Sequence, residues 1–452
     1  MATLTESLRR VKHHLADVLP DRLIHAACRD IGHTWRERQL GPTVTTYLLL
    51  QQVLHGNPAI GELRHLSQMG FTDSAYCQAR QRLPLAVLRE LQRAVAGRQR
   101  AAVDDDRSAR WKGHRVFLID GTSFSMPDTE ELRETFGQPS AQAEGCGFPV
   151  AHLLVQFDVH TGYLLQTAVA PMRTHDMARV ATMHRDLRPN DVFVGDRAFA
   201  SYAHLAMCRQ DSVHGLFRAH QKQIIDFRPH RRHAGPDEPG ATAKGRPRSR
   251  WVKRLGKDDQ LVEYQKPKSR PAWLSAEECA ALPATLLVRE LRYRVHVPGR
   301  RTKQVTLVTT LLDPKRYPAQ ALAKLYGLRW RAEVDLKHLK QTLGMDVLRS
   351  KTVPGVMKEL LAFVIVYNLV RRVMHAAARR QKVAPSRISF IDAWRWLRQA
   401  RPGDEPPVLA CNPKRAGRFE PRVRKRRPKQ YPLMTRPRVE LRKAILTQKL
   451  AA

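Results

Sequence analysis

The chain has 452 residues, 42% of them hydrophobic, which is enough for several folded domains and argues against wholesale disorder. It carries 79 Lys and Arg residues against 42 Asp and Glu residues, a formal net charge of +37, and such a field repels itself unless a polyanion such as nucleic acid neutralises it. No signal peptide or membrane-spanning run is expected, and the six cysteines form no CxxC pair, which disfavours a disulfide framework or a zinc ribbon.

Residues 1–105 are expected to form a helical DNA-binding region. Thr72 offers an N-cap for one helix, and Pro84 opens another. Short helices with basic faces fit a DNA groove, although an ordinary bundle with a solvated basic face has the same pattern. Residues 101–108 are predicted to form a linker. Apolar residues at helical spacing predict a first helix on Leu4, Leu8, Val11, Leu15 and Val18.

Residues 111–220 are predicted to form the first part of an α/β catalytic domain. One apolar run ends at Asp120 and another at Asp196, and both runs are typical of buried strands. Residues 160–162 form the turn of a hairpin between them. The predicted order is three strands, a helix, a strand, a helix and a strand. This is the element order of a ribonuclease H-like sheet.

Residues 221–310 are predicted to form a β-rich insertion, which begins as a basic stretch rich in Pro and Gly and ends in two strand-like runs. Residues 311–382 then complete the catalytic domain with a long helix and a buried one. Residues 383–452 are expected to contain a C-terminal helix and a basic tail, which is either flexible and solvated or follows the phosphates of a nucleic acid. The basic residues of that tail include Arg422, Arg424, Lys425, Arg426, Arg427 and Lys429.

A helix from about Pro318 to Gly344 carries a third acid. At roughly 100° per residue, Tyr326, Arg329, Glu333 and Lys340 fall within about 60° of one another on the helix. Lys337 lies near the same polar edge, and leucines form the buried stripe beside it. An ordinary amphipathic helix with surface ion pairs would explain any one of these residues singly, but not the aligned set following two strand-end aspartates.

Three carboxylates, Asp120, Asp196 and Glu333, are therefore the candidate catalytic residues and metal ligands. Two acids at strand ends and one on a helix can converge on a pair of hard cations. Mg²⁺ suits such oxygen ligands, and Mn²⁺ is expected to be able to replace it. Two metal ions held in this way are the equipment for cutting and joining phosphodiester bonds.

These residues give the chain a resemblance to a known family. Tyr326, Arg329, Glu333 and Lys340 fit the signature Tyr-x2-Arg-x3-Glu-x6-Lys without a gap. Residues 119–122 (Ile-Asp-Gly-Thr) and 195–199 (Gly-Asp-Arg-Ala-Phe) look like the two aspartate motifs that accompany it. Over about residues 111–380, the chain resembles a bacterial insertion-sequence transposase of the DDE class.

The resemblance implies a ribonuclease H-like catalytic domain, an N-terminal region that binds transposon ends and a C-terminal region that helps two chains dimerise. The expected reaction is cleavage of double-stranded DNA at the element's ends, followed by transfer of the 3′-hydroxyl ends to target DNA. A bacterial cytoplasmic, nucleoid-associated enzyme without membrane contacts is expected. The residues implied in DNA binding are Tyr326, Arg329, Lys337, Lys340, Arg197 and Trp251, with Trp273 as the alternative to Trp251 for holding a flipped base.

Two other functions fit the same residues. A structure-selective nuclease would use the same metal site and stop at hydrolysis. A catalytically silent regulator derived from a transposase would bind DNA without cutting it, although the intact acids argue against that function. A basic RNA-binding protein is a third possibility, but no aromatic stacking motif of the common RNA-binding modules is present.

Overall fold

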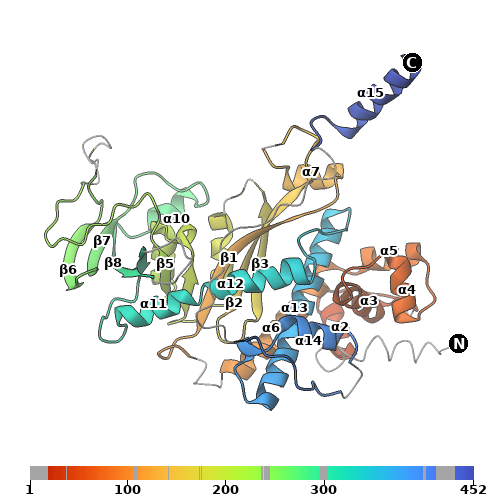
Figure 1. Cartoon of the computed structure of the whole chain (residues 1–452), viewed down its shortest axis with the longest axis horizontal. Helices are drawn as coiled ribbons and strands as arrows, with labels where there is room; N and C mark the ends of the chain where they lie inside the picture. Colours follow the sequence, from red (N-terminus) through yellow and green to blue (C-terminus); the bar gives the residue numbers. More distant parts are fainter. Residues whose placement is uncertain are drawn as a thin grey trace.

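The computed structural model describes residues 19–36, 38–104, 110–140, 142–172, 174, 176–235, 238, 245–295, 304–400, 404–413 and 433–451. Its strands are β1 (Val116–Ser125), β2 (Val150–Asp158), β3 (Leu164–Pro171), β4 (Val192–Gly195), β5 (His214–Arg218), β6 (Arg250–Gly256), β7 (Asp259–Gln265), β8 (Thr285–Arg294) and β9 (Gln304–Thr309). They form one nine-stranded sheet in the order β3-β2-β1-β4-β5-β9-β8-β7-β6, which in Figure 1 runs from the middle of the molecule (β1, β2 and β3) to its left side (β6 and β7).

The first five strands follow the order expected from the sequence. β2 pairs antiparallel with β1 and β3, whereas β4 pairs parallel with β1 and β5 pairs parallel with β4. The hairpin turn at residues 160–162 is present, with Gly162 at a φ of +70°. This mixed sheet is consistent with a ribonuclease H-like transposase fold.

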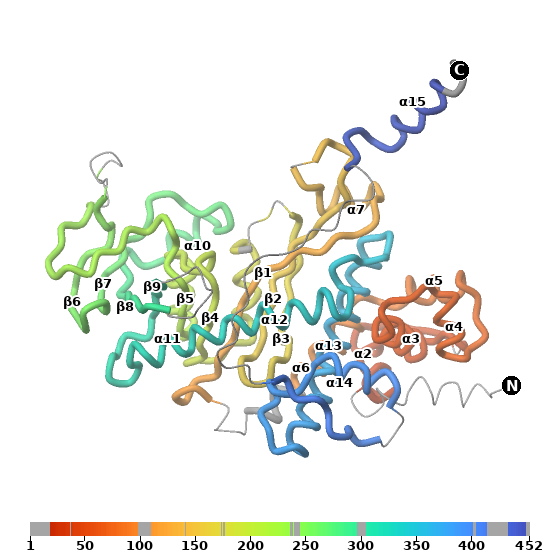
Figure 2. Tube along the Cα trace, in the orientation of Figure 1, coloured from red at the N-terminus to blue at the C-terminus, as the bar shows by residue number. Residues whose placement is uncertain are grey.

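The last four strands continue the same sheet on its other side. β9 pairs antiparallel with β5, and β8, β7 and β6 follow in turn. β8 and β9 correspond to the two strand-like runs expected in the insertion, whereas β6 and β7 were not individually predicted. The strands therefore extend the sheet rather than form a separate one; the green part of the trace in Figure 2 marks where they lie.

The N-terminal helices pack together around one long helix. The helices of this group are α2 (Asp21–Asp30), α3 (Pro42–Leu54), α4 (Ile60–Ser67), α5 (Asp73–Arg82), α6 (Leu85–Asp104) and α13 (Val353–Gln381). The N-cap prediction is confirmed, because Thr72 Oγ1 accepts a hydrogen bond of 3.1 Å from the Ala75 N–H. The linker prediction is wrong up to residue 104, since α6 continues through it. The predicted first helix lies outside the described residues.

The long helix α13 is buried over most of its length. By length and composition, it is the one helix among the described residues that could cross a membrane. However, 78% of its most apolar stretch is buried inside the protein, against α3, α6 and α14 (Phe390–Leu397). α13 therefore has the burial of a core helix, as the sequence predicted for this apolar run.

The helix expected from 318 to 344 is broken into three parts. α11 (Ala319–Gly327) ends in a tightened turn, in which the Arg329 N–H donates to the Tyr326 carbonyl, three residues back. α12 (Trp330–Lys337) follows and passes into a π-helical turn, His338–Thr342. The tightened turn and the wider π-turn both depart from 3.6 residues per turn, so a single helical wheel does not describe the segment.

The two faces of the sheet are covered by different helices. Val116 and Leu118 of β1 join the core beneath α12 and α13, whereas Phe117 and Ile119 join the core beneath α8 (Val180–His184) and α9 (Tyr202–Gln210). This alternation follows from the two-residue period of a strand. In the C-terminal region, the described part includes a helix, α15 (Arg438–Ala451), which was not predicted from the sequence. The predicted basic cluster at 422–429 lies outside the described residues.

Candidate active site

Asp120 and Asp196 lie at equivalent positions of two neighbouring parallel strands. The pairing of β1 with β4 ends at Ile119 and Gly195, and the two aspartates come directly after this last pair. The prediction that the first strand ends at Asp120 is wrong, because β1 continues to Ser125 along β2. Asp120 shares the face of Leu118, which is the face covered by α12.

Gly195 allows the close approach of the two strands beside the aspartates. A Cβ atom at this position would lie 2.8 Å from Ile119 Cγ2 and 2.8 Å from Phe199 Cδ2, which is closer than side chains tolerate. After Gly195, Asp196 precedes a short 3₁₀ helix, Arg197–Phe199, whose Phe199 N–H donates to the Asp196 carbonyl at 3.0 Å. The packing around this glycine therefore fixes the backbone of Asp196.

Glu333 lies on α12 and pairs with an arginine of the same turn. Arg329 Nη2 donates to Glu333 Oε1 at 2.7 Å, with the Arg329 side chain 18% exposed and that of Glu333 37% exposed. α12 packs over β1, as Figure 1 shows, so this pair faces the edge that bears Asp120. The guanidinium carries the positive charge among the acids of this edge.

The electrostatics of Asp120 connect all three acids. Burial raises the pKa of Asp120 to about 6, against the opposing effect of Arg329. A hydrogen bond of 3.0 Å from the Gly121 N–H also lowers that pKa, whereas the negative charges of Glu333 and Asp196 raise it. Asp196 and Glu333 therefore both lie near enough to Asp120 to act on its carboxyl. The oxygens of these three acids do not all lie within 4.8 Å of one another, since the one such group among the described residues is a different one. The acids are therefore spaced apart in this structure, with the Arg329 guanidinium near them.

This donor set fits hard divalent cations. Every ligand atom is a carboxylate oxygen, which is the chemistry that Mg²⁺ takes in proteins. A buried carboxyl with a raised pKa, beside two further acids, is stabilised in its charged form by a cation. Arg329 supplies part of that positive charge in this structure.

Tyr326 lies close to the acids, but its side chain is buried. It is 7% exposed, and burial raises the pKa of its hydroxyl above the ordinary value, with further effects from Arg329 and Asp196. The same environment includes two residues that the sequence did not point to, Arg218 and Tyr293. Arg218 ends β5, the parallel strand beside β4, so its place at this edge could have been found from the strand order.

The predicted DNA-binding residues are distributed over a wider area. Lys337 is exposed on α12, and Lys340 is half-buried in the π-helical turn. Arg197 is exposed beside Asp196, where its Nη1 donates to Gln221 Oε1 at 2.6 Å. No observation here tests their roles, which stay predictions.

The two tryptophans are not part of the acidic group in this structure. Trp251 lies on β6, six strands from β1 and roughly 30 Å away at about 4.8 Å per strand. Its ring packs on His230 with 4.5 Å between ring centroids. Trp273 packs instead against the core on the α8 and α9 face of the sheet. A role for Trp251 in holding a base would need DNA that extends along the sheet.

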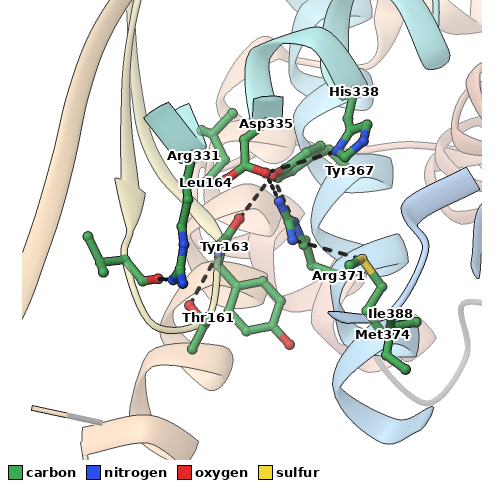
Figure 3. A network of polar contacts seen from close by, with 12 residues as sticks. Thr161, Tyr163, Leu164, Arg331, Asp335, His338, Tyr367, Arg371, Met374 and Ile388 are labelled. Atoms are coloured by element: carbon green, nitrogen blue, oxygen red, sulfur yellow. Dashed lines mark hydrogen bonds and ion pairs between the residues drawn. The ribbon is translucent and has the colours of Figure 1, made fainter. Parts of the chain in front are cut away.

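A buried polar network holds α12 in place, as Figure 3 shows. Arg371 of α13 pairs with Asp335, two residues after Glu333, and both side chains are less than 10% exposed. Arg371 Nε also donates to the Tyr367 hydroxyl at 2.8 Å. One turn earlier on α12, Arg331 Nη1 donates to the Val159 carbonyl at 3.2 Å. The helix that carries Glu333 is thus tied both to α13 and to the loop after β2.

Comparison with known proteins places this arrangement in a family. The InsG transposase for insertion sequence element IS4 from Escherichia coli K12 is 25% identical over 455 residues, which cover 94% of this chain and 95% of InsG. InsZ of the same strain is 32% identical over 132 residues, 28% of this chain and 42% of its own length. Among solved structures, the piggyBac transposase in a synaptic complex with hairpin DNA is similar with a TM-score of 0.41 and 11% identity, over 87% of this chain and 79% of that one.

A protein-family model covers the acids themselves. Residues 111–369 match the transposase DDE domain, a range that includes Asp120, Asp196 and Glu333 and more than half of the chain. DDE transposases cleave DNA and transfer its strands, and they generally depend on divalent metal ions. With β1 and β4 carrying two aspartates to one edge and α12 bringing a glutamate over it, this chain belongs to the family of DDE-domain transposases of bacterial insertion sequences.

Proposed function

We propose that this transposase cuts the DNA at the ends of its own insertion sequence and joins the freed 3′-hydroxyls to target DNA. We assign it to the group with the signature Tyr-x2-Arg-x3-Glu-x6-Lys, on Tyr326, Arg329, Glu333 and Lys340. The observation that carries the proposal is the grouping of Asp120, Asp196 and Glu333 around Arg329.

In this proposal, Asp120, Asp196 and Glu333 are the ligands of two divalent cations, Mg²⁺ or in its place Mn²⁺. Bound ions of this kind activate a water or a 3′-hydroxyl and stabilise the leaving oxygen of a phosphodiester. The support for this assignment is an all-oxygen donor set in which one carboxyl is buried and has its pKa raised to about 6.

In this proposal, Arg329 has two roles, one in the protein alone and one with DNA bound. In the protein alone, its guanidinium neutralises Glu333 and lowers the pKa of Asp120. With cations held by the acids, that guanidinium would be free to hold a phosphate of the cut strand, for which its planar pair of donors is well suited. Lys337 and Lys340 extend the positive charge along the same helix, and Arg197 does so next to Asp196.

The remaining residues position the DNA around the cut. Tyr326 positions the DNA backbone beside the cut, and Trp251 is the candidate for holding an extruded base. The partners are the two ends of the element and the target, bound by two copies of the chain. The net charge of +37 supports this proposal, because a bound polyanion relieves the self-repulsion of such a chain.

The test uses three isosteric substitutions and one control. Asp120→Asn, Asp196→Asn and Glu333→Gln are each assayed for cleavage of a duplex that carries the element's end. Each is expected to lose about a thousandfold in rate, or about 4 kcal/mol of transition-state stabilisation, while it still binds the duplex. The control Asp128→Asn, on an exposed acid paired with Arg133, is expected to cleave normally. A folded, DNA-binding triad variant with near-normal cleavage refutes the role of that acid.

A second assay separates transposition from the alternatives. Precleaved ends with free 3′-hydroxyls are mixed with target DNA and the unchanged protein in Mg²⁺. Joined products support strand transfer. A protein that cleaves ends but never joins them is a nuclease, and one that binds ends with neither reaction is a regulator; either outcome refutes the proposal.

A further inference from the structure

Three metal-ligating side chains meet in the core on the side of the sheet opposite α12. They are His184 at the end of α8, and His204 and Cys208 on α9. All three are buried, and one ligand atom from each lies within 4.8 Å of the other two. His204 and Cys208 are four residues apart, so α9 presents both on one face. Nothing in the proposed reaction uses them.

The hydrogen bonds of the two histidines leave a place for a cation between them. His204 Nδ1 lies 2.8 Å from the Phe199 carbonyl, so that nitrogen must carry a hydrogen. His184 Nδ1 lies 2.7 Å from Asp211 Oδ2, which likewise asks for a hydrogen on the imidazole when the acid is charged. The two Nε2 atoms then both present lone pairs, yet they lie only 3.0 Å apart. Something positive, a proton or a metal ion, has to lie between them.

The partners of the two Nδ1 atoms are those that metal-binding histidines have. A histidine that ligates a metal through one nitrogen nearly always donates its other N–H to a carboxylate or a backbone carbonyl. Here, Asp211 serves His184 and the Phe199 carbonyl serves His204. Both rings are thereby held with Nε2 directed at the same point.

Charge and ligand chemistry favour a metal ion over a proton. Two imidazoles and a thiolate are a ligand set for Zn²⁺ or Cu⁺. With Zn²⁺, the Cys208 thiolate would cancel one of the two positive charges inside the core, and the exposed Asp211 carboxylate would offset the other from the surface through His184. The aromatic rings of Phe193, Phe199 and Phe217 pack around His204, and Cys208 is fully buried, which would keep its thiolate from oxidants in solution. Metal–nitrogen bonds of about 2.0–2.1 Å would need the two Nε2 atoms to separate by only a few tenths of an ångström.

We propose that His184, His204 and Cys208 bind one transition-metal ion, with Zn²⁺ as the probe, as a structural centre separate from the acids. Its place in the fold indicates its effect. His204 is bonded to the carbonyl of Phe199, which ends the 3₁₀ turn that starts at Asp196. A metal ion here would join α8 to α9 and, through the hydrogen bond of His204 to the Phe199 carbonyl, would restrain that turn. The inference does not depend on whether Asp196 is catalytic.

The test measures metal content and the nature of the ligands. The full chain is purified, dialysed against a weak chelator and analysed for metals, and we expect about one equivalent of zinc per chain. Replacement by Co²⁺ should give the near-ultraviolet absorption of a cobalt–thiolate bond, and bound Zn²⁺ should raise the unfolding temperature. Cys208→Ser is expected to lose the absorption and the zinc-dependent shift, and His204→Gln to lose the zinc.

Two controls identify the site. Cys28→Ser removes another buried thiol, in the N-terminal helical core, and should keep both signals. Asp120→Ala removes an acid of the other group and should also keep the cobalt–thiolate band. Should Cys208→Ser fail to fold, the unchanged chain still decides. Absence of zinc together with absence of a cobalt–thiolate band means that a shared proton joins the histidines, and the proposal is overturned. A band that survives in Cys208→Ser overturns it as well.

Discussion

Arg329 Nη2 lies 2.7 Å from Glu333 Oε1, and the same guanidinium lowers the pKa of Asp120. One arginine thus balances acids that come from β1, from the end of β4 and from α12. Without it, burial and mutual repulsion would all raise the pKa of Asp120. Arg329 therefore favours the charged form of Asp120.

Replacing Arg329 should move the pH dependence of DNA cleavage. In Arg329→Ala, the acidic limb of the rate profile is expected to shift upward by about one pH unit, the size of effect that a neighbouring arginine has on an aspartate. Arg329→Lys should shift it less, because the charge remains. The measurement is the end-cleavage rate as a function of pH, with the exposed Lys324→Ala of α11 as control. An unchanged profile in Arg329→Ala would contradict the electrostatic role.

Asp120→Asn should make the protein more stable at neutral pH. Burial raises the pKa of Asp120 from 3.8 to about 6, so the folded state holds its proton more tightly than the unfolded state does. The stability due to this group is complete below pH 3.8 and is lost as the pH rises to about 6. The substitution is therefore expected to add up to about 3 kcal/mol of unfolding free energy above pH 6. Chemical unfolding at pH 8 and pH 4 checks it, and an equal gain at both would contradict the mechanism.

Removing one partner of the Asp335–Arg371 pair should destabilise the protein strongly. Burial lowers the pKa of Arg371 to about 10, so it is still charged at neutral pH. Asp335→Asn or Arg371→Met leaves one buried charge alone, at a cost of about 3–5 kcal/mol. The double variant Asp335→Asn/Arg371→Met should recover most of this loss. Urea unfolding measures it, and Glu405→Gln, in an exposed pair with Arg380, should change stability by less than about 1 kcal/mol.

Gly195→Ala should disturb Asp196 without touching any carboxylate. The added methyl meets Ile119 and Phe199 at 2.8 Å, and overpacking of this kind costs about 1–3 kcal/mol. Because the strain falls on the backbone next to Asp196, the loss in the cleavage rate, expressed as a free energy, should exceed the loss in unfolding free energy. Gly235→Ala is the control, since nothing lies within 4 Å of its added methyl. Normal cleavage and stability in Gly195→Ala would contradict this prediction, because Ile119 and Phe199 would then move aside without cost.

The sequence predicts the acid-bearing part of the fold because its signals are local. Apolar runs that stop at Asp120 and Asp196 mark two strands whose ends meet once the strands are parallel. The end of the first strand was placed too early, because β1 extends past Asp120 only by pairing with β2, which is distant in sequence. The two added strands β6 and β7 were missed for the same reason, since their strand character comes from pairing with each other and with β8.

The helix that carries Glu333 shows where periodicity stops being informative. A wheel assumes a constant angle per residue, but the turn at residues 328–329 is tighter and that at 338–342 is wider. Arg329 and Glu333 stay together because no break separates them, whereas Lys340 lies within the π-turn itself. The cluster of His184, His204 and Cys208 had one local signal, the four-residue spacing on α9. Its third member comes from α8, so only the packing of the two helices brings it in.

The unbroken hydrogen bonding between β5 and β9 has a mechanical meaning. Hinges form where two parts of a protein are connected only by loops, and not where their strands are hydrogen-bonded to each other. The outer four strands and the edge that bears the aspartates are therefore expected to move as one rigid body. A duplex that touches both parts has to supply the bend itself, which for a site of 20–30 base pairs costs on the order of 1–6 kcal/mol.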